Sequence, residues 1–202
     1  MNPLLKFNSL AISTLFCLLC SINLSSSFAD TEQKAKDIQS YEEECKRGNS
    51  EGCYYLGRSY DKGNGIEQDH VKAAEYYTKA CSLNYAAGCY NLGVSYDEGE
   101  GVEKDQTKAV KYYKKACNLN DESGCYNLGV SYENGEGIEQ NHAKAVEYYT
   151  RACDLNDESG CYNLGISYDR GEGTKQDRTK ATEYYTKACD LGSSTSCDKL
   201  KK

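Results

Sequence analysis

Cysteine is the residue type whose number and spacing in this sequence most clearly indicate chemistry. Of the 12 cysteines, two lie among the first 29 residues, and the other ten form Cys-x7-Cys pairs that begin at Cys45, Cys81, Cys117, Cys153 and Cys189. Zinc sites usually place cysteines two to four residues apart or combine them with histidines. An even set at this wider, regular spacing instead predicts a framework of disulfide bonds.

Serine and lysine offer a second chemistry. Ser59 with Lys62, and Ser196 with Lys199, have the Ser-x-x-Lys spacing in which a lysine can activate a serine nucleophile. The serine of the first match recurs down the chain without its lysine, which is typical of a polar position near the end of a helix. Both pairs are candidates for catalysis on spacing alone.

Composition and charge narrow the functional classes. The formal net charge of −7 disfavours binding to nucleic acid or to anionic membrane surfaces. The two histidines, His70 and His142, are far apart in the sequence, and the cysteine spacing does not suit zinc. The sequence therefore predicts neither a metal site nor a cofactor.

The first 29 residues have the pattern of a signal peptide. Lys6 supplies a positive start, residues 10–24 are mostly apolar, and Ser27-Phe28-Ala29 gives a cleavage site with small residues. We therefore expect a secreted or periplasmic chain with no membrane insertion after cleavage. Such an oxidising compartment agrees with the prediction of disulfides.

The cysteines recur with a fixed step of 36 residues, which indicates a repeat protein. The same step carries a Leu-Gly pair and a Tyr-Tyr pair. A capping helix is expected over residues 30–49 and a second one over residues 194–202. The four units between them cover residues 50–85, 86–121, 122–157 and 158–193.

Each unit contains two helical patterns. In the second unit, small and apolar residues at i, i+3, i+4 and i+7 predict a helix from about Ala86 to Glu98, which Gly99 then ends. Asp105 can cap a second helix through its side-chain oxygen. A glycine inside each first helix costs about 1 kcal/mol relative to alanine, so its recurrence predicts close contact between paired helices. The fold class that follows is an all-α solenoid of helix pairs.

The repeated residues carry a family resemblance. Cys-Tyr-Asn-Leu-Gly-x-x-Tyr followed by Ala-x-x-x-Tyr-x-x-Ala is similar to the tetratricopeptide pattern, with Cys89 at the place of its tryptophan. The 36-residue variant with a Gly-x-Gly loop resembles the Sel-one-like repeat. With a Cys-x7-Cys pair in every unit and a signal peptide, the chain resembles the secreted Helicobacter cysteine-rich protein family. The resemblance implies a right-handed α/α solenoid stapled by disulfides.

Two regular disulfide schemes suit antiparallel helices. The cysteines of one Cys-x7-Cys pair can join across the turn between units, or the two cysteines within a unit can join, as in Cys89 with Cys117. The first scheme uses all ten cysteines, whereas the second leaves Cys45 and Cys197 unpaired, and the family resemblance also favours the first. The predicted bonds are Cys45–Cys53, Cys81–Cys89, Cys117–Cys125, Cys153–Cys161 and Cys189–Cys197.

The resemblance also places the first helices of successive units on the concave side of the solenoid. Tyrosine and asparagine there offer stacking surface and amide hydrogen bonds, which suit an extended peptide or a glycan; as an alternative, some of these tyrosines belong to the core. We expect the chain to bind a protein, a peptide or a peptidoglycan fragment. The predicted ligand-binding residues are Tyr90, Asn91, Asp97, Tyr126, Asn127, Glu133, Tyr162, Asn163 and Asp169.

Two alternative functions follow from the family and from secretion. Members of the cysteine-rich family are classed as β-lactamases and penicillin-binding proteins, which implies β-lactams as ligands and hydrolysis of their ring. A serine enzyme of that kind also has Ser-Asp-Asn and Lys-Thr-Gly, and neither occurs in this chain, so the enzyme hypothesis rests on the family alone. Secretion also permits a role in interaction with a host.

Overall fold

The structure is a computed structural model that describes residues 32–201, so the predicted signal peptide lies outside the described residues. Helices form the regular structure of this range, and no strand occurs in it. The first helix covers residues 32–46. It is followed by α2 (Ser50–Lys62), α3 (His70–Ser82), α4 (Ala86–Glu98), α5 (Gln106–Asn118), α6 (Glu122–Asn134), α7 (His142–Asp154), α8 (Glu158–Arg170), α9 (Arg178–Asp190) and α10 (Ser194–Lys199). Each helix of residues 32–201 is too short or too polar to cross a bilayer.

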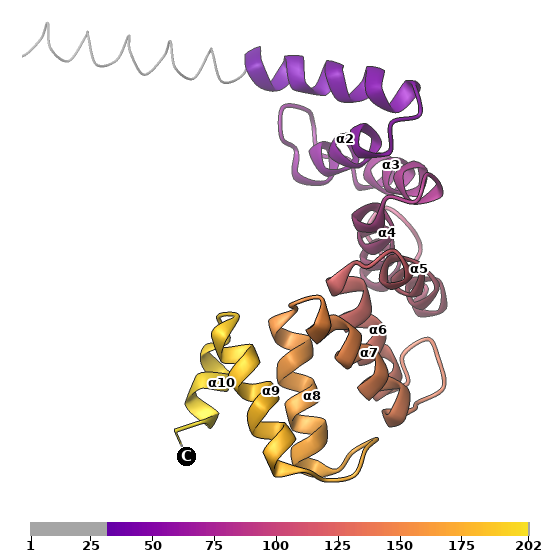
Figure 1. Cartoon of the computed structure of the whole chain (residues 1–202). Helices are drawn as coiled ribbons and strands as arrows, with labels where there is room; N and C mark the ends of the chain where they lie inside the picture. The colour runs from indigo at the N-terminus through magenta and orange to yellow at the C-terminus, as the bar shows by residue number, and fades with distance from the viewer. Residues whose placement is uncertain (1–31, 202) are drawn as a thin grey trace, which may run out of the picture.

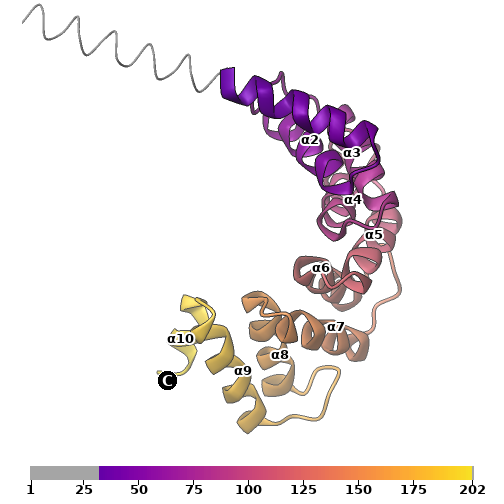
Figure 2. The same ribbon diagram turned by 45° about the horizontal axis from the view of Figure 1, so that its top comes forward.

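The helices stack as a solenoid. Within the units α2 packs on α3, α4 on α5, α6 on α7 and α8 on α9, and the second helix of each unit packs on the first helix of the next. Packing between nearest neighbours defines repeat architectures. Figures 1 and 2 show the stack curving into an arc, with α2, α4 and α6 on its inner side and α3, α5 and α7 on its outer side. The predicted all-α solenoid is confirmed.

Capping residues set the helix boundaries. Each first helix of a unit ends at a glycine with φ between 68° and 80°, a conformation that side chains disfavour; these are Gly63, Gly99, Gly135 and Gly171. Each second helix follows a residue whose side-chain oxygen accepts a hydrogen bond from a backbone N–H of the first turn, which satisfies an otherwise unpaired donor. These caps are Asp69, Asp105, Asn141 and Asp177.

The core lies between the two helices of each unit. A Cβ at Gly93 of α4 would lie 2.6 Å from the ring of Tyr113 of α5, which is 3% exposed. The backbone of α4 can approach the ring only because no side chain intervenes. The same glycine–tyrosine contact recurs in the other three units, between Gly57 and Tyr77, Gly129 and Tyr149, and Gly165 and Tyr185.

Disulfides close the unit junctions. The first of the two pairing schemes is present, with cysteines of the three middle bonds at most 2% exposed. The three middle bonds join the end of one unit to the first helix of the next, and the two terminal bonds join the capping helices to the first and last units; these are the contacts that a solenoid most needs to strengthen. The bonds are Cys45–Cys53, Cys81–Cys89, Cys117–Cys125, Cys153–Cys161 and Cys189–Cys197.

A cation from the next unit adds a second link at three junctions. Each donates to the carbonyl oxygen of a cysteine in the last turn of the preceding unit's second helix, where helical carbonyls lack partners and the helix dipole favours positive charge. The bonds run from Lys115 Nζ to Cys81 (2.6 Å), from Arg151 Nη2 to Cys117 (2.7 Å) and from Lys187 Nζ to Cys153 (2.7 Å).

Candidate functional site

The first helices of the units form the inner layer of the arc, and this layer is the candidate binding surface. The tyrosines of this surface are more exposed than those of the core. Tyr90 of α4, Tyr126 of α6 and Tyr162 of α8 are half-buried. Each rests on a buried core tyrosine, which fixes the orientation of the inner ring and leaves part of it exposed. The ring centroids are 6.1 Å apart for Tyr90 and Tyr113, 6.0 Å for Tyr126 and Tyr149, and 5.8 Å for Tyr162 and Tyr185.

Asparagines link the inner tyrosines of successive units. Burial raises the pKa of Tyr90 and of Tyr126, and an asparagine of the next unit, Asn127 and Asn163 respectively, lies close enough to each hydroxyl to oppose that rise. Nδ2 of Asn127 also donates to the carbonyl oxygen of Ser123 at 3.0 Å. Because the contacts between these tyrosines and asparagines cross unit junctions, the predicted residues form a continuous row along the inner layer.

Two of the predicted acidic residues are partners of core tyrosines. The hydroxyl of Tyr113 donates to Asp97 Oδ2 at 3.5 Å, and that of Tyr149 donates to Glu133 Oε2 at 2.6 Å. Burial and these carboxylates raise the pKa of both tyrosines. Asp97 and Glu133 therefore help to position the rings on which the inner tyrosines rest.

The third predicted acid, Asp169, lies at the C-terminal end of the inner layer. It borders a hollow of about 520 Å³ together with Tyr185, Lys199 and Arg178. Asn91, the remaining predicted residue, is half-buried on α4. The hollow therefore extends the candidate surface beyond the predicted row.

Sequence reasoning missed two aspartates of this surface. Asp121 and Asp157 cap α6 and α8, and both are half-buried. Burial raises the pKa of both carboxyls, and Glu122 raises it further. Asp121 is close enough to Tyr90 to raise the pKa of that tyrosine in turn. The capping pattern was visible in the sequence, but the contact with the preceding unit was not.

Replacement of Asp121 by asparagine is expected to raise the melting temperature at pH 7. Because burial raises the folded-state pKa above the unfolded value, the native state loses stability as pH rises through that range. Asparagine keeps the cap, as Asn49 does by accepting from the N–H of Gly52 at 2.9 Å. Melting curves should show a gain at pH 7 that disappears below the reference value of 3.8.

Asp105→Asn is the matched control for that measurement. The backbone N–H of Lys108 lowers the pKa of Asp105, so its charged form stabilises the folded state above the unfolded pKa. The control should lower the melting temperature at pH 7. A change of the same sign in both variants would contradict the assignment of Asp121.

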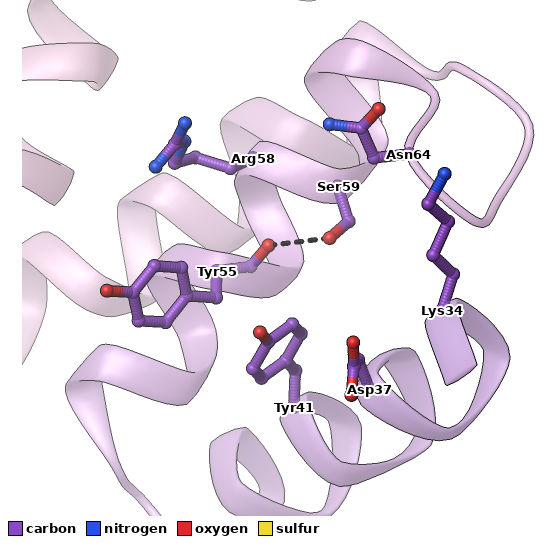
Figure 3. Close-up of a pocket in the computed structure, with 7 residues that line it drawn as sticks. All are labelled: Lys34, Asp37, Tyr41, Tyr55, Arg58, Ser59 and Asn64. Carbon is purple, nitrogen blue, oxygen red and sulfur yellow. Dashed lines mark hydrogen bonds between the residues drawn. The ribbon is translucent and has the colours of Figure 1, made fainter. Parts of the chain in front are cut away.

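A second hollow, of about 190 Å³, lies at the N-terminal end of the inner layer (Figure 3). Its walls include Tyr41 of the first helix and Tyr55 of α2, whose rings stack with centroids 5.4 Å apart. Lys34, Arg58 and Asp37 also line it, so it holds two cations and one carboxylate. This end of the surface is therefore aromatic with an excess of positive charge, whereas the middle carries the half-buried aspartates.

Ser59 of the first Ser-x-x-Lys match borders this hollow, but Ser59 and Lys62 have different partners. The hydroxyl of Ser59 donates to the carbonyl oxygen of Tyr55 at 2.9 Å (Figure 3). Nζ of Lys62 lies 3.0 Å from Asp61 Oδ2. A serine nucleophile needs its base within hydrogen-bond reach. In the structure, each residue instead has a partner of its own.

The serine and the lysine of the second Ser-x-x-Lys match also have separate partners. Ser196 is fully buried, and its hydroxyl donates to that of Ser193 at 3.0 Å. Nζ of Lys199 donates to the hydroxyl of Tyr185 at 3.2 Å. Ser196 thus belongs to the C-terminal cap, and Lys199 to the hollow beside Asp169.

A curved stack of helix pairs, stapled by disulfides and lined with half-exposed tyrosines, defines a protein-interaction scaffold. Five disulfides also indicate an extracytoplasmic protein, because the cytosol keeps thiols reduced. A model of the Sel1 repeat matches residues 50–85, 86–121, 123–157 and 159–193. The chain belongs to the Sel1 repeat family, and within it to the Helicobacter cysteine-rich proteins.

Solved structures share the fold. Helicobacter pylori cysteine rich protein B is 41% identical, with a TM-score of 0.55, over 66% of this chain and 96% of its own. A protective antigen of uropathogenic Escherichia coli with an SLR fold is 31% identical, with a TM-score of 0.77, over 81% of this chain. The match spans only 35% of that antigen's length. A Sel1 repeat protein from Oxalobacter formigenes is 26% identical, with a TM-score of 0.72, over 81% of this chain and 73% of its own. A comparison with curated proteins gives no match.

Proposed function

We propose that this protein binds an extended segment of a partner protein along its inner layer. The observation that carries the proposal is the row of tyrosines and asparagines whose side chains lie close together across two successive unit junctions, Tyr90 with Asn127 and Tyr126 with Asn163. A side-chain amide has two donors and an acceptor oxygen, so each asparagine can bond both a tyrosine and a peptide backbone. A row of such amides suits a ligand with regularly spaced backbone groups.

The tyrosines supply the apolar part of such a site. A tyrosine side chain offers a large, rigid contact area at a low cost in conformational entropy. The rings of Tyr90, Tyr126 and Tyr162 are already held by the core tyrosines beneath them. Little ordering is then needed when a ligand binds, which favours affinity.

The distribution of charge along the inner layer indicates which parts of the bound segment are basic and which are acidic. A cationic group between Asp121 and Asp157 would relieve the unfavourable burial of their charges, which is the main cause of their raised pKa. The hollow at the N-terminal end is lined by Lys34, Arg58 and Asp37, so two cations face one carboxylate, and the excess positive charge suits a carboxylate of the ligand. We propose a segment with a lysine or arginine over the middle of the inner layer and an acidic group at its N-terminal end.

Tyr126→Ala is expected to weaken this binding about thirty-fold or more, as the loss of a buried aromatic anchor does at other interfaces. Short random peptides would be selected on the oxidised wild-type protein, and their dissociation constants measured for wild type and variant. A muropeptide and a penicillin would be measured beside them, because both are alternative ligands of the same surface.

Tyr148→Ala on the outer-layer helix α7 is the matched control. It also removes one tyrosine pair, since Tyr148 stacks on Tyr132 at 5.5 Å, so the loss of packing is similar. We expect its dissociation constants to remain close to those of the wild type. Equal weakening in both variants would show that stability, and not the inner layer, governs binding.

A further inference from the structure

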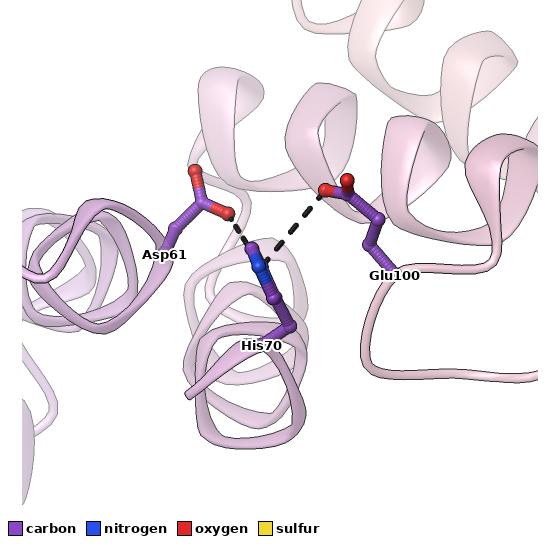
Figure 4. A group of neighbouring side chains, drawn as sticks. All are labelled: Asp61, His70 and Glu100. Carbon is purple, nitrogen blue, oxygen red and sulfur yellow. Dashed lines mark hydrogen bonds and ion pairs between the residues drawn. The ribbon is translucent and has the colours of Figure 1, made fainter. Parts of the chain in front are cut away.

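Three side chains able to ligate a metal ion meet at the junction of the first two units (Figure 4). Asp61 lies near the end of α2, His70 is the first residue of α3, and Glu100 lies in the loop after α4. Figure 4 shows both carboxylates pointing at the imidazole from different sides. Nδ1 of His70 lies 3.1 Å from Asp61 Oδ1 and 3.9 Å from Glu100 Oε2.

The spacing of these atoms is close to that of a metal centre. The three ligand atoms lie within 4.8 Å of one another. Tetrahedral zinc with bonds of about 2.1 Å holds its ligand atoms roughly 3.4 Å apart. Small side-chain rotations would therefore bring the three atoms to the distance that an ion requires.

The backbone holds the two units together at this point. Gly101 has a φ of 72°, and a Cβ added there would collide with the carbonyl group of His70. The loop that carries Glu100 is thus seated against the first residue of α3. The same contact recurs at the next two junctions, between Gly137 and Gln106 and between Gly173 and His142.

The other junctions place different side chains at the equivalent positions. The second junction has Gln106 in place of the histidine, which removes the imidazole ligand. The third has His142, but the acid equivalent to Glu100, Glu172, has an arginine as its partner, with Oε2 3.8 Å from Nη1 of Arg170. Among the described residues, the first junction alone brings three such ligand atoms within 4.8 Å.

We propose that Asp61, His70 and Glu100 bind a divalent transition-metal ion such as Zn²⁺, which bridges the first two units. One imidazole and two carboxylates suit zinc, nickel or copper better than magnesium, which prefers oxygen ligands alone. Three protein ligands leave a fourth position for water or for a group of a partner. Nζ of Lys62 lies 3.0 Å from Oδ2 of Asp61, the second oxygen of that carboxylate. Its positive charge repels the ion and therefore weakens metal binding.

The test is calorimetric titration of the oxidised, tag-free protein with ZnCl₂. One saturable site is expected, weakened about ten-fold or more in His70→Gln, which copies the residue that the second junction has naturally. His142→Gln should bind as the wild type does, and Lys62→Ser should bind more tightly. Magnesium should not saturate the site.

A second readout uses the only two histidines of the chain, His70 and His142. Zinc should shift the imidazole NMR signals of His70 and leave those of His142 in place. Saturable binding that survives His70→Gln, or the absence of saturable binding to the wild type, would overturn the proposal and leave only the hydrogen bond between His70 and Asp61 at this junction.

Discussion

Reduction of the disulfides is expected to unfold the solenoid at temperatures where the oxidised protein is folded. Each bond closes a loop of nine residues, for which the chain-entropy model gives about 2.5 kcal/mol of stabilisation. Five such bonds together reach the order of the whole free energy of unfolding of a typical domain. Each unit buries its apolar surface only against its neighbours. Loss of the junction bonds therefore weakens the contacts on which the folding of every unit depends.

Circular dichroism melts with and without reductant would measure this effect. Variants that each lack one disulfide would show whether the position of a bond matters as well as the number of bonds. Cys117→Ala with Cys125→Ala removes a fully buried bond in the middle of the stack, whereas Cys45→Ala with Cys53→Ala removes a terminal bond whose first cysteine is half-buried. The middle pair should lower the melting temperature more. An unchanged melt after full reduction would show that helix packing alone holds the units together.

Gly129→Ala is expected to destabilise the protein by about 2–3 kcal/mol, although alanine is the better helix former by about 1 kcal/mol. An added Cβ would lie 2.6 Å from two ring carbons of Tyr149. That ring is fully buried and its hydroxyl is bonded to Glu133, so it has no room to move aside. The methyl group must therefore separate α6 from α7, and neighbouring contacts are lost with it.

Thermal melts would detect this loss as a fall of roughly 4–12 °C for a chain of this size. Asn134→Ala, at an exposed position of the same helix, is the control and should change stability little. Adding Tyr149→Leu to Gly129→Ala should restore part of the stability, because the smaller side chain leaves space for the methyl group. If the two changes were simply additive, the glycine would have a role other than clearance for the ring.

The metal proposal and the peptide proposal concern separate parts of the solenoid and can fail independently. The metal site depends on residues of the first junction, Asp61, His70 and Glu100. The peptide row depends on Tyr90, Tyr126 and the asparagines of later units. A variant such as His70→Gln should therefore leave peptide binding over the third unit unchanged.

Much of the fold was predictable from the sequence because its determinants are local and repeated four times. Glycine after the first helix and aspartate or asparagine before the second act within one helical turn, so Gly99 and Asp105 marked the boundaries that the structure shows. The glycine–tyrosine contact was also indicated, since an unfavourable glycine recurring inside a helix requires a packing reason. The five disulfides followed from counting cysteines along the repeat.

The site was predictable only in part. The family resemblance assigned Tyr90, Tyr126 and Tyr162 to the inner layer, and the structure shows that they are half-buried. It could not show that Asp97 and Glu133 bond core tyrosines, because that depends on side-chain directions between two packed helices. Nor could it show that Ser59 and Lys62 have different partners, because those partners depend on the side-chain conformations along α2.

The sequence by itself determined the repeat, the helix pairs, their caps and the number of disulfide bonds, since each of these depends on residues close together in the chain. Only the tertiary structure decided which side chains of different units meet. The burial of Asp121 near Tyr90 and the meeting of His70 with Glu100 both depend on how one unit is rotated onto the next. That rotation comes from the packing of whole helix faces, which repeat spacing does not encode residue by residue.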